Sequence, residues 1–268
     1  MKGKSSVAYP YVIWMTIFIA IPLGLVIYFA FTDKAGNFTL SNISQLSQYA
    51  TVFFNSIVLA AVATIICLIL AYPVAYILSR MRVARQRMML MLVMLPMWMN
   101  FLLRTYAWMS LLERNGLINQ LFALIGLGPF RMINTNGAVI LGMVYNYLPF
   151  MILPLYTIMV KIDQSLIEAA QDLGGGNIDV LTKVLLPLSL PGISTGITMV
   201  FVPAISTFVI SRMLGGSFLI GDLIELQFLG NSYNYNLGSA MSLALMVIVL
   251  LCLSVTNQLN EEGLEGVI

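Results

Sequence analysis

The sequence contains no histidine and very little charge. Only 9% of its 268 residues are charged, 13 Lys and Arg against 11 Asp and Glu, whereas a soluble globular protein carries about 25%. So few charges cannot cover a water-exposed surface, which excludes a soluble enzyme. Without histidine the chain has no His-ligated metal site, no His general base and no Ser–His–Asp triad. A net charge of +2 offers no basic face to nucleic acid.

Cysteine is also scarce, since Cys67 and Cys252 are the only two and both lie in apolar runs. They are typical of small core residues and give no disulfide framework. The chain also lacks the G-x-x-x-x-G-K-[ST] loop that binds nucleotide phosphates. We therefore predict no catalytic residue, no metal site and no cofactor in this chain.

Apolar residues make up 60% of the chain, and long charge-free runs alternate with short charged segments. A helix needs about 20 apolar residues to cross the hydrocarbon of a bilayer. The runs predict an all-α, polytopic membrane protein, with residues 1–268 forming a single transmembrane domain. The six predicted transmembrane helices cover about 9–31, 52–79, 88–112, 137–160, 184–211 and 237–257.

Basic residues set the expected orientation, because they concentrate in cytoplasmic loops. With the N-terminus inside, the inner side holds eight bases: Lys2, Lys4, Arg80, Arg82, Arg85, Arg87, Lys161 and Lys183. The outer side holds four: Lys34, Arg114, Arg131 and Arg212. We expect a multi-pass protein with both termini in the cytoplasm.

The inner loop over 161–187 is more structured than a simple link. Ser165 and Glu168 have the spacing of a capping box, which predicts a helix beginning there. Gly174 is placed to end this helix with a positive φ. Asn177 or Asp179 can cap a second helix, which Pro187 can break or kink.

The first of these two helices carries an unusual surface. Leu166, Ala169, Ala170 and Leu173 share one face, and the two alanines allow another backbone to approach closely. Asp172 lies near the helix C-terminus, where the dipole disfavours an anion and a cationic partner would help. These features favour a docking surface for a soluble cytoplasmic protein over a loop that is merely capped for its own stability.

The same loop carries a family motif: Glu168-Ala169-Ala170, then Gly174 after three residues, then Val184-Leu185-Leu186-Pro187 after nine more. It resembles the EAA–G–IxLP motif of permease subunits of bacterial ABC importers, with Val184 where Ile is usual. The segments 95–112, 142–159 and 217–230 narrow the resemblance to B-type permeases of type I spermidine/putrescine importers. The tail after Asn260 has three acids and no base, which departs from that pattern.

The resemblance implies the type I importer permease fold, with Glu168, Ala169, Ala170, Asp172, Gly174 and Pro187 in a cytoplasmic coupling element. It implies a location in the bacterial inner membrane. The partners it implies are a second, C-type permease, a dimeric ABC ATPase that carries ATP and Mg, and an extracytoplasmic polyamine-binding protein.

Polar and aromatic residues at membrane depth are candidates for the solute path. In a straight third helix starting near Met88, Trp98 would lie roughly 15 Å and Arg104 roughly 24 Å from the inner surface. Tyrosine and tryptophan faces attract alkylammonium groups. The candidate path and gate residues are Trp98, Asn100, Tyr106, Trp108, Tyr145, Tyr147, Asp222 and Glu225.

Arg104 is the only charge within a predicted span, and its sign argues against direct contact with a polycation. We expect it to reach the outer surface or to pair with an outer carboxylate, Asp222 or Glu225. These two acids would lie on one helical face if their loop is helical. They would then either receive a substrate ammonium or neutralise Arg104, and the sequence leaves both open.

Two alternatives remain at this stage. A related ABC importer for thiamine, phosphonate, iron or sulfate would keep the coupling loop, and an anion would use Arg104 more directly. An ion-coupled secondary carrier is disfavoured, because the chain shows no inverted repeat and almost no intramembrane acid.

Overall fold

The computed structural model describes residues 9–216, 218–230 and 233–265, and this part of the chain is helical without a named strand. Five helical segments are long and apolar enough to cross a membrane, and a bent pair of helices supplies a sixth candidate. The predicted all-α, polytopic architecture is therefore confirmed. The five segments are Tyr9–Ala30, Ser41–Ser79, Asn136–Met159, Asn177–Ile205 and Tyr235–Thr256.

The α-helices fall into an N-terminal and a C-terminal half. Those of the N-terminal half are α1 (Tyr9–Met15), α2 (Ile21–Ala30), α3 (Ser41–Gln45), α4 (Ala50–Ser79), α5 (Val83–Met94), α6 (Phe101–Leu112) and α7 (Leu117–Leu124). Those of the C-terminal half are α8 (Asn136–Met159), α9 (Gln164–Asp172), α10 (Asn177–Val180), α11 (Leu186–Ile205), α12 (Val209–Leu214), α13 (Ile220–Leu229) and α14 (Tyr235–Glu265). A π-helical turn joins α1 to α2 over Thr16–Ala20, and another joins α10 to α11 over Leu181–Leu185.

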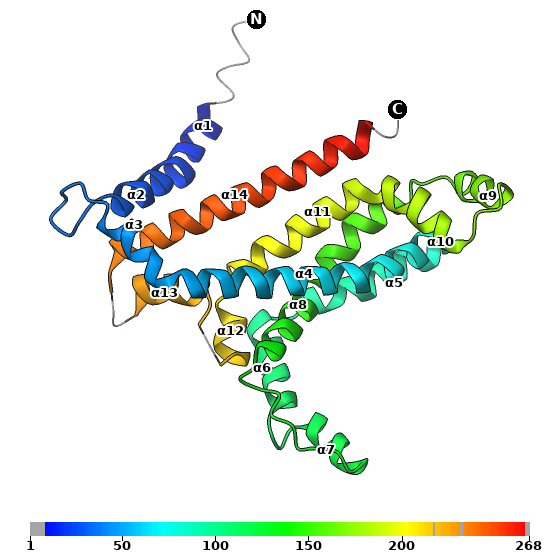
Figure 1. The fold of residues 1–268 in the computed structure, drawn as a ribbon, viewed down its shortest axis with the longest axis horizontal. Helices are drawn as coiled ribbons and strands as arrows, with labels where there is room; N and C mark the ends of the chain where they lie inside the picture. The colour runs from blue at the N-terminus through cyan, green and yellow to red at the C-terminus, as the bar shows by residue number, and fades with distance from the viewer. Residues whose placement is uncertain (1–8, 217, 231–232, 266–268) are drawn as a thin grey trace, which may run out of the picture.

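The core lies where α4, α8 and α11 pack on one another, with α14 along α11 (Figure 1). Small residues allow the close approach, as is usual between membrane helices. A Cβ atom at Gly192 would lie 3.1 Å from the Pro154 carbonyl oxygen, and one at Gly196 would lie 2.5 Å from Met151 Sδ. Both glycines lie on α11 and face α8, so they set the spacing of these two helices.

The third predicted span is wrong as a single helix over 88–112. The chain runs through α5 and a 3-10 turn, Leu95–Trp98, and then bends by 87° into the α6–α7 segment. Pro96 lies in the turn, where its missing N–H costs no helical hydrogen bond. Asn100 then caps α6, accepting from the N–H groups of Leu102 and Leu103. Depths counted along a straight helix therefore do not hold beyond the bend.

The fifth predicted span, 184–211, is also interrupted. Its helix ends at Ile205, and α12 begins separately at Val209. The sixth span, predicted over 237–257, belongs to the longer helix α14. At the N-terminus, Tyr9–Ala30 has no buried residue in its apolar window and lies apart from the core beside α14 (Figure 1).

The two ends of the bundle carry different elements (Figure 1). One end holds the α4–α5 turn together with α9 and α10, and the other holds α3 and α13. The bases assigned to the inner side from Arg80 to Arg87, and Lys161 and Lys183, lie on segments at the first end. Lys2 and Lys4 are outside the described residues. The six described bases of this set therefore lie on segments at one end of the bundle.

Candidate functional site

Helix α9 is capped by Asp163. The Asp163 carboxylate accepts a hydrogen bond of 3.0 Å from the Ser165 N–H, and this bond is the main reason that the pKa of Asp163 is lowered. The capping box expected at Ser165 and Glu168 is wrong, because Ser165 is already inside the helix. An aspartate at the N-cap satisfies a free N–H and also favours the positive end of the helix dipole.

Gly174 ends α9 as predicted, with a φ of +83°. Its left-handed backbone lets the Gly175 N–H donate to the Ala170 carbonyl at 3.0 Å, which closes the last helical turn. Beyond the turn, the Gly176 N–H donates to Asp179 at 3.2 Å, so Asp179 caps the second helix from within its first turn. Lys183 forms an ion pair with Asp179 at 2.6 Å, one helical turn along the chain.

The first helix of the loop has one buried and one exposed face. Ile167 is buried in a small cluster with Ile162, Val180 and Leu185, packed against Tyr76 of α4. The exposed side of α9, the turn after it and the start of α10 together form what we call the α9 surface, where apolar side chains meet solvent although no lipid is expected there. The α9 surface consists of Leu166 (47% exposed), Ala169, Leu173 (90%) and Ile178 (77%), with Glu168 and Asp172 also exposed and Ala170 half-buried at its edge.

The second helix of the loop continues into the membrane. Pro187 lies in the first turn of α11, directly after the π-helical turn, and the chain stays helical from Asn177 to Ile205. The widened turn accommodates a proline that would otherwise clash with the preceding carbonyls. The expected break at Pro187 is thus a π-helical turn, and α10 is joined to α11 without a flexible link.

The bend between α5 and α6 holds two candidate path residues, Trp98 and Asn100, together with Arg104. Trp98 is 78% exposed at the end of the 3-10 turn, while the Asn100 side chain is occupied in capping α6. Arg104 is only 8% exposed. Its Nη1 donates to the Pro96 carbonyl at 2.5 Å, and its guanidinium lies 5.7 Å from the centre of the Tyr145 ring. The Arg104 side chain therefore connects α6 to the 3-10 turn across the bend.

The remaining aromatic candidates differ in exposure: Trp108 and Tyr145 are half-buried, Tyr106 is exposed and Tyr147 is buried. The ring centres of Trp108 and Tyr145 lie 5.4 Å apart in a T-shaped arrangement, which places these two residues and Arg104 together. Tyr106 is 51% exposed. Tyr147 is only 8% exposed and donates its hydroxyl to the Pro203 carbonyl at 3.3 Å, so its ring belongs to the core.

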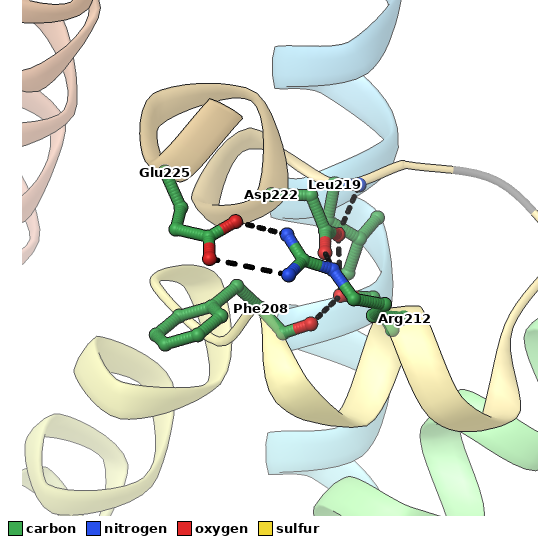
Figure 2. Close-up of polar contacts among 6 residues, drawn as sticks. Phe208, Arg212, Leu219, Asp222 and Glu225 are labelled. Atoms are coloured by element: carbon green, nitrogen blue, oxygen red, sulfur yellow. Dashed lines mark hydrogen bonds and ion pairs between the residues drawn. The ribbon is translucent and has the colours of Figure 1, made fainter. Parts of the chain in front are cut away.

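Asp222 and Glu225 lie on one face of α13, as predicted for a helical loop (Figure 2). Their cation is Arg212 of α12, which pairs with Glu225 through two nitrogens and approaches Asp222 at 3.6 Å. The predicted pairing of either acid with Arg104 is therefore wrong. Arg212 was visible in the sequence as an outer base, but its distance along the chain from Glu225 gave no sign of the contact.

Asp222 is the structural member of the outer cluster (Figure 2). It is fully buried, and one carboxylate oxygen accepts from the Ser211 hydroxyl at 2.5 Å and from the Leu219 N–H at 2.9 Å. Burial raises the pKa of Asp222 despite these bonds. Glu225 is partly exposed, and the Arg212 guanidinium lowers its pKa. The cluster thus fastens α12 to α13 and leaves Glu225 as the acid nearest to solvent.

None of these groups forms a metal site. Within the described part of the chain, three or more His, Cys, Asp or Glu side chains never gather closely enough to hold an ion. The arrangement offers aromatic faces, one partly exposed acid and an exposed apolar surface on the α9 loop.

Known proteins share both the sequence and the fold. A family model described as "Binding-protein-dependent transport system inner membrane component" matches residues 71–261. "Spermidine/putrescine transport system permease protein PotB" of Haemophilus influenzae is 39% identical over 260 residues, 92% of this chain and 91% of that protein. The Escherichia coli protein of the same name is 35% identical over 254 residues, 90% and 92% of the two chains. The crystal structure of a bacterial ABC transporter involved in alginate import has a TM-score of 0.80 at 16% identity, covering 96% and 94%; this likeness shows the fold alone.

Proposed function

The chain belongs to the family of binding-protein-dependent transport system inner membrane components, and from this premise we propose that it is a permease subunit of an ATP-driven importer of spermidine and putrescine. The substrate assignment rests on the 35–39% identity, over nine-tenths of the chain, to relatives named for those two polyamines. Its task is to bind and pass a solute, and it performs no chemical step itself.

The α9 surface supports a cytoplasmic partner. Apolar side chains as exposed as Leu173 and Ile178 are unfavourable in water and become buried when a second protein covers them. We assign this surface to one subunit of a dimeric ABC ATPase, which supplies ATP and Mg. A second, C-type permease would complete the path, and an extracytoplasmic binding protein would deliver the polyamine.

The orientation follows from the same assignment. An ATPase in the cytoplasm requires the α9 end of the bundle to be the inner end, which is also the end with most of the described bases. Both termini then lie in the cytoplasm of a bacterial cell, and the protein is a multi-pass component of the inner membrane.

Aromatic faces supply most of the attraction for the substrate along the proposed path. A desolvated cation–aromatic contact contributes about 2 kcal/mol, which suits a solute that must bind and then leave. Trp98 and Tyr106 are exposed, and the Trp108 ring packs against the Tyr145 ring. Asn100 and Tyr147 would act indirectly, by shaping the bend and the core.

Glu225 is the proposed first contact for a substrate ammonium group. It lines a cavity of about 410 Å³ together with Ser206 and Phe208 at the end of the bundle opposite α9. The rest of the lining is mostly apolar, which matches the alkyl segments of a polyamine. Asp222 is buried beneath it and holds Arg212 and α13 in place.

Arg104 distinguishes the main proposal from import of an anion such as phosphonate or sulfate. An anion site needs donors directed at the solute, whereas the Arg104 guanidinium is buried against Pro96 and two aromatic rings. An ion-coupled secondary carrier is disfavoured by the family match.

The decisive experiment is uptake of radiolabelled spermidine, putrescine and thiamine by the complete complex in proteoliposomes. We expect ATP-dependent uptake of the two polyamines and none of thiamine, with a complex lacking the ATPase as the control. Uptake of thiamine alone would refute the substrate, and polyamine uptake by this chain without the ATPase would refute the importer.

A further inference from the structure

Three side chains link the neighbouring ends of α4, α5 and α8, and one of them, Arg80, also reaches the start of the α9 loop. Arg80, at the end of α4, donates from Nη1 to the Ile162 carbonyl at 3.1 Å. Gln86 of α5 donates to the carbonyls of Ser79 and Met81 at 3.1 and 2.9 Å. The Tyr156 hydroxyl of α8 donates to the Gln86 side-chain oxygen at 3.1 Å. We call Arg80, Gln86 and Tyr156 the inner clasp.

Helix-end geometry explains why these side chains are needed. The last four carbonyls of a helix have no partner within it, and Gln86 satisfies that of Ser79, the last residue of α4, together with that of Met81 in the link to α5. Gln86 is only 8% exposed, so its amide is committed to this task. The Arg80 guanidinium lies 5.6 Å from the centre of the Tyr76 ring, and Tyr76 packs against the buried cluster around Ile167.

Packing alone does not hold the α9 loop against α4. A cavity of about 550 Å³ lies between them, lined by Tyr72, Tyr76, Ile167 and residues of α10. The loop leaves through α10 into α11 without a break, but its entry from α8 is a short non-helical link. The Arg80–Ile162 hydrogen bond is the polar tie between that link and α4.

We propose that the inner clasp is a positioning element that passes the movement of α9 to α4 and α5. This inference rests on the proposed function. Helix α5 ends at the bend that carries Trp98, so a tie at its inner end connects the coupling loop to the solute path. Without the tie, α9 can shift into the cavity while α4 and α5 stay in place, and ATP is then hydrolysed with little transport.

The test compares Arg80→Gln with Arg82→Gln in the complete complex in proteoliposomes. Arg82 is an exposed neighbour whose side chain has no hydrogen bond or ion pair among the described residues. Replacing Arg82 therefore removes the same charge as replacing Arg80 but breaks no contact. We expect the ATP hydrolysed per polyamine imported to rise about tenfold in Arg80→Gln, the factor for one lost hydrogen bond to a charged group. Arg82→Gln should match the wild type, and Arg80→Lys should be intermediate.

Tyr156→Phe provides a milder variant that removes one hydroxyl from the inner clasp and keeps the ring. It should raise the same ratio by about threefold, in proportion to a neutral hydrogen bond. If Arg80→Gln fails to assemble, Tyr156→Phe decides. An unchanged ratio in the assembled variants overturns the proposal.

A second measurement does not depend on the solute. In a Cys252→Ser, Met99→Cys background, the rate of labelling by a water-soluble maleimide is measured with and without ATP. Met99 is 52% exposed and Cys67 is buried, whereas Cys252 is half-buried and is therefore replaced. ATP should change the rate in the wild type and in Arg82→Gln but not in Arg80→Gln. An equal change in all three refutes the inner clasp, while absence of polyamine uptake by the wild type refutes only the proposed substrate.

Discussion

Replacing Gly174 by valine perturbs the α9 loop through backbone conformation alone. A Cβ atom at this position would meet no atom within 4 Å, so the added side chain does not clash. The φ of +83° is the difficulty, because a left-handed conformation costs a residue with a Cβ about 1–2 kcal/mol and a β-branched residue more. That free energy corresponds to a factor of roughly 5–30 in the population of the native turn.

The loop relieves this strain by opening the turn, which breaks the hydrogen bond from Gly175 to Ala170. The α9 surface then loses its fixed direction, while the transmembrane helices are unaffected. We expect Gly174→Val to insert and assemble normally but to lower ATP-dependent uptake about tenfold, within the factor above. ATP hydrolysis should no longer respond to the solute.

Gly174→Asn is the matched control, since asparagine adopts positive φ more easily than other residues with a Cβ. It should retain most of the uptake. Uptake by proteoliposomes is measured together with phosphate release, at equal amounts of assembled complex. Wild-type uptake and coupling in Gly174→Val would refute the argument that the left-handed turn sets the docking geometry.

Three further changes test the path and its supports. Trp98→Ala should lower polyamine uptake more than Trp108→Ala, because Trp98 is 78% exposed and Trp108 is half-buried. Replacing Asp222 by Asn and Glu225 by Gln together should lower uptake. In the unchanged protein, the Glu225 ion pair should add thermal stability above the usual pKa of glutamate. This added stability should fall as the pH drops through the lowered pKa of Glu225. Arg104→Gln should destabilise the complex by about 2 kcal/mol in thermal unfolding, because it removes a charged hydrogen bond at the bend.

For each of these three predictions, a specific result would contradict the reasoning. A greater loss of uptake in Trp108→Ala than in Trp98→Ala would show that the solute contacts the half-buried Trp108 ring instead. Glu225→Gln alone should remove the acid-dependent loss of stability, and a pH profile unchanged by it would exclude the ion pair as its cause. Arg114→Gln, at an exposed position, controls for removing a positive charge, so equal destabilisation by it and Arg104→Gln would contradict the role of the Pro96 bond.

Composition and local chemistry predicted much of the fold. Charge-free runs located the membrane segments because burial in lipid excludes charge, and the turn at Gly174 follows from local backbone preference. The spacing of Asp222 and Glu225 placed both acids on one face of α13. These features depend on residues near one another in the chain.

The errors arose where a run of apolar residues conceals a change of direction. Hydropathy does not register that Pro96 and Asn100 stop one helix and start another at 87°. Likewise Ser206 lies in an uncharged run although the helix ends at Ile205. The pairing of Arg212 with Glu225 depends on how α12 turns back towards α13, which no local pattern encodes.

On the proposed path, a transported cation would compete with Arg104 for the face of the Tyr145 ring. The Arg104 guanidinium lies 5.7 Å from the Tyr145 ring centre, and the Trp108 ring packs against the same ring in a T-shaped arrangement. A polyamine can therefore use Tyr145 only after Arg104 moves, whereas Trp98 is exposed. One cation–aromatic contact contributes only about 1–2 kcal/mol. Replacement of Arg104 by a polyamine on the Tyr145 ring would therefore cost little free energy and would leave the solute weakly bound.

This competition ranks Trp98 ahead of Tyr145 as a solute contact and yields a last prediction. Tyr145→Leu should lower thermal stability by releasing Arg104, while lowering uptake less than Trp98→Ala does. Tyr145→Phe, which keeps the ring, should preserve both properties. If Tyr145→Leu instead abolishes uptake at unchanged stability, the ring serves the solute directly and Arg104 does not occupy it during transport.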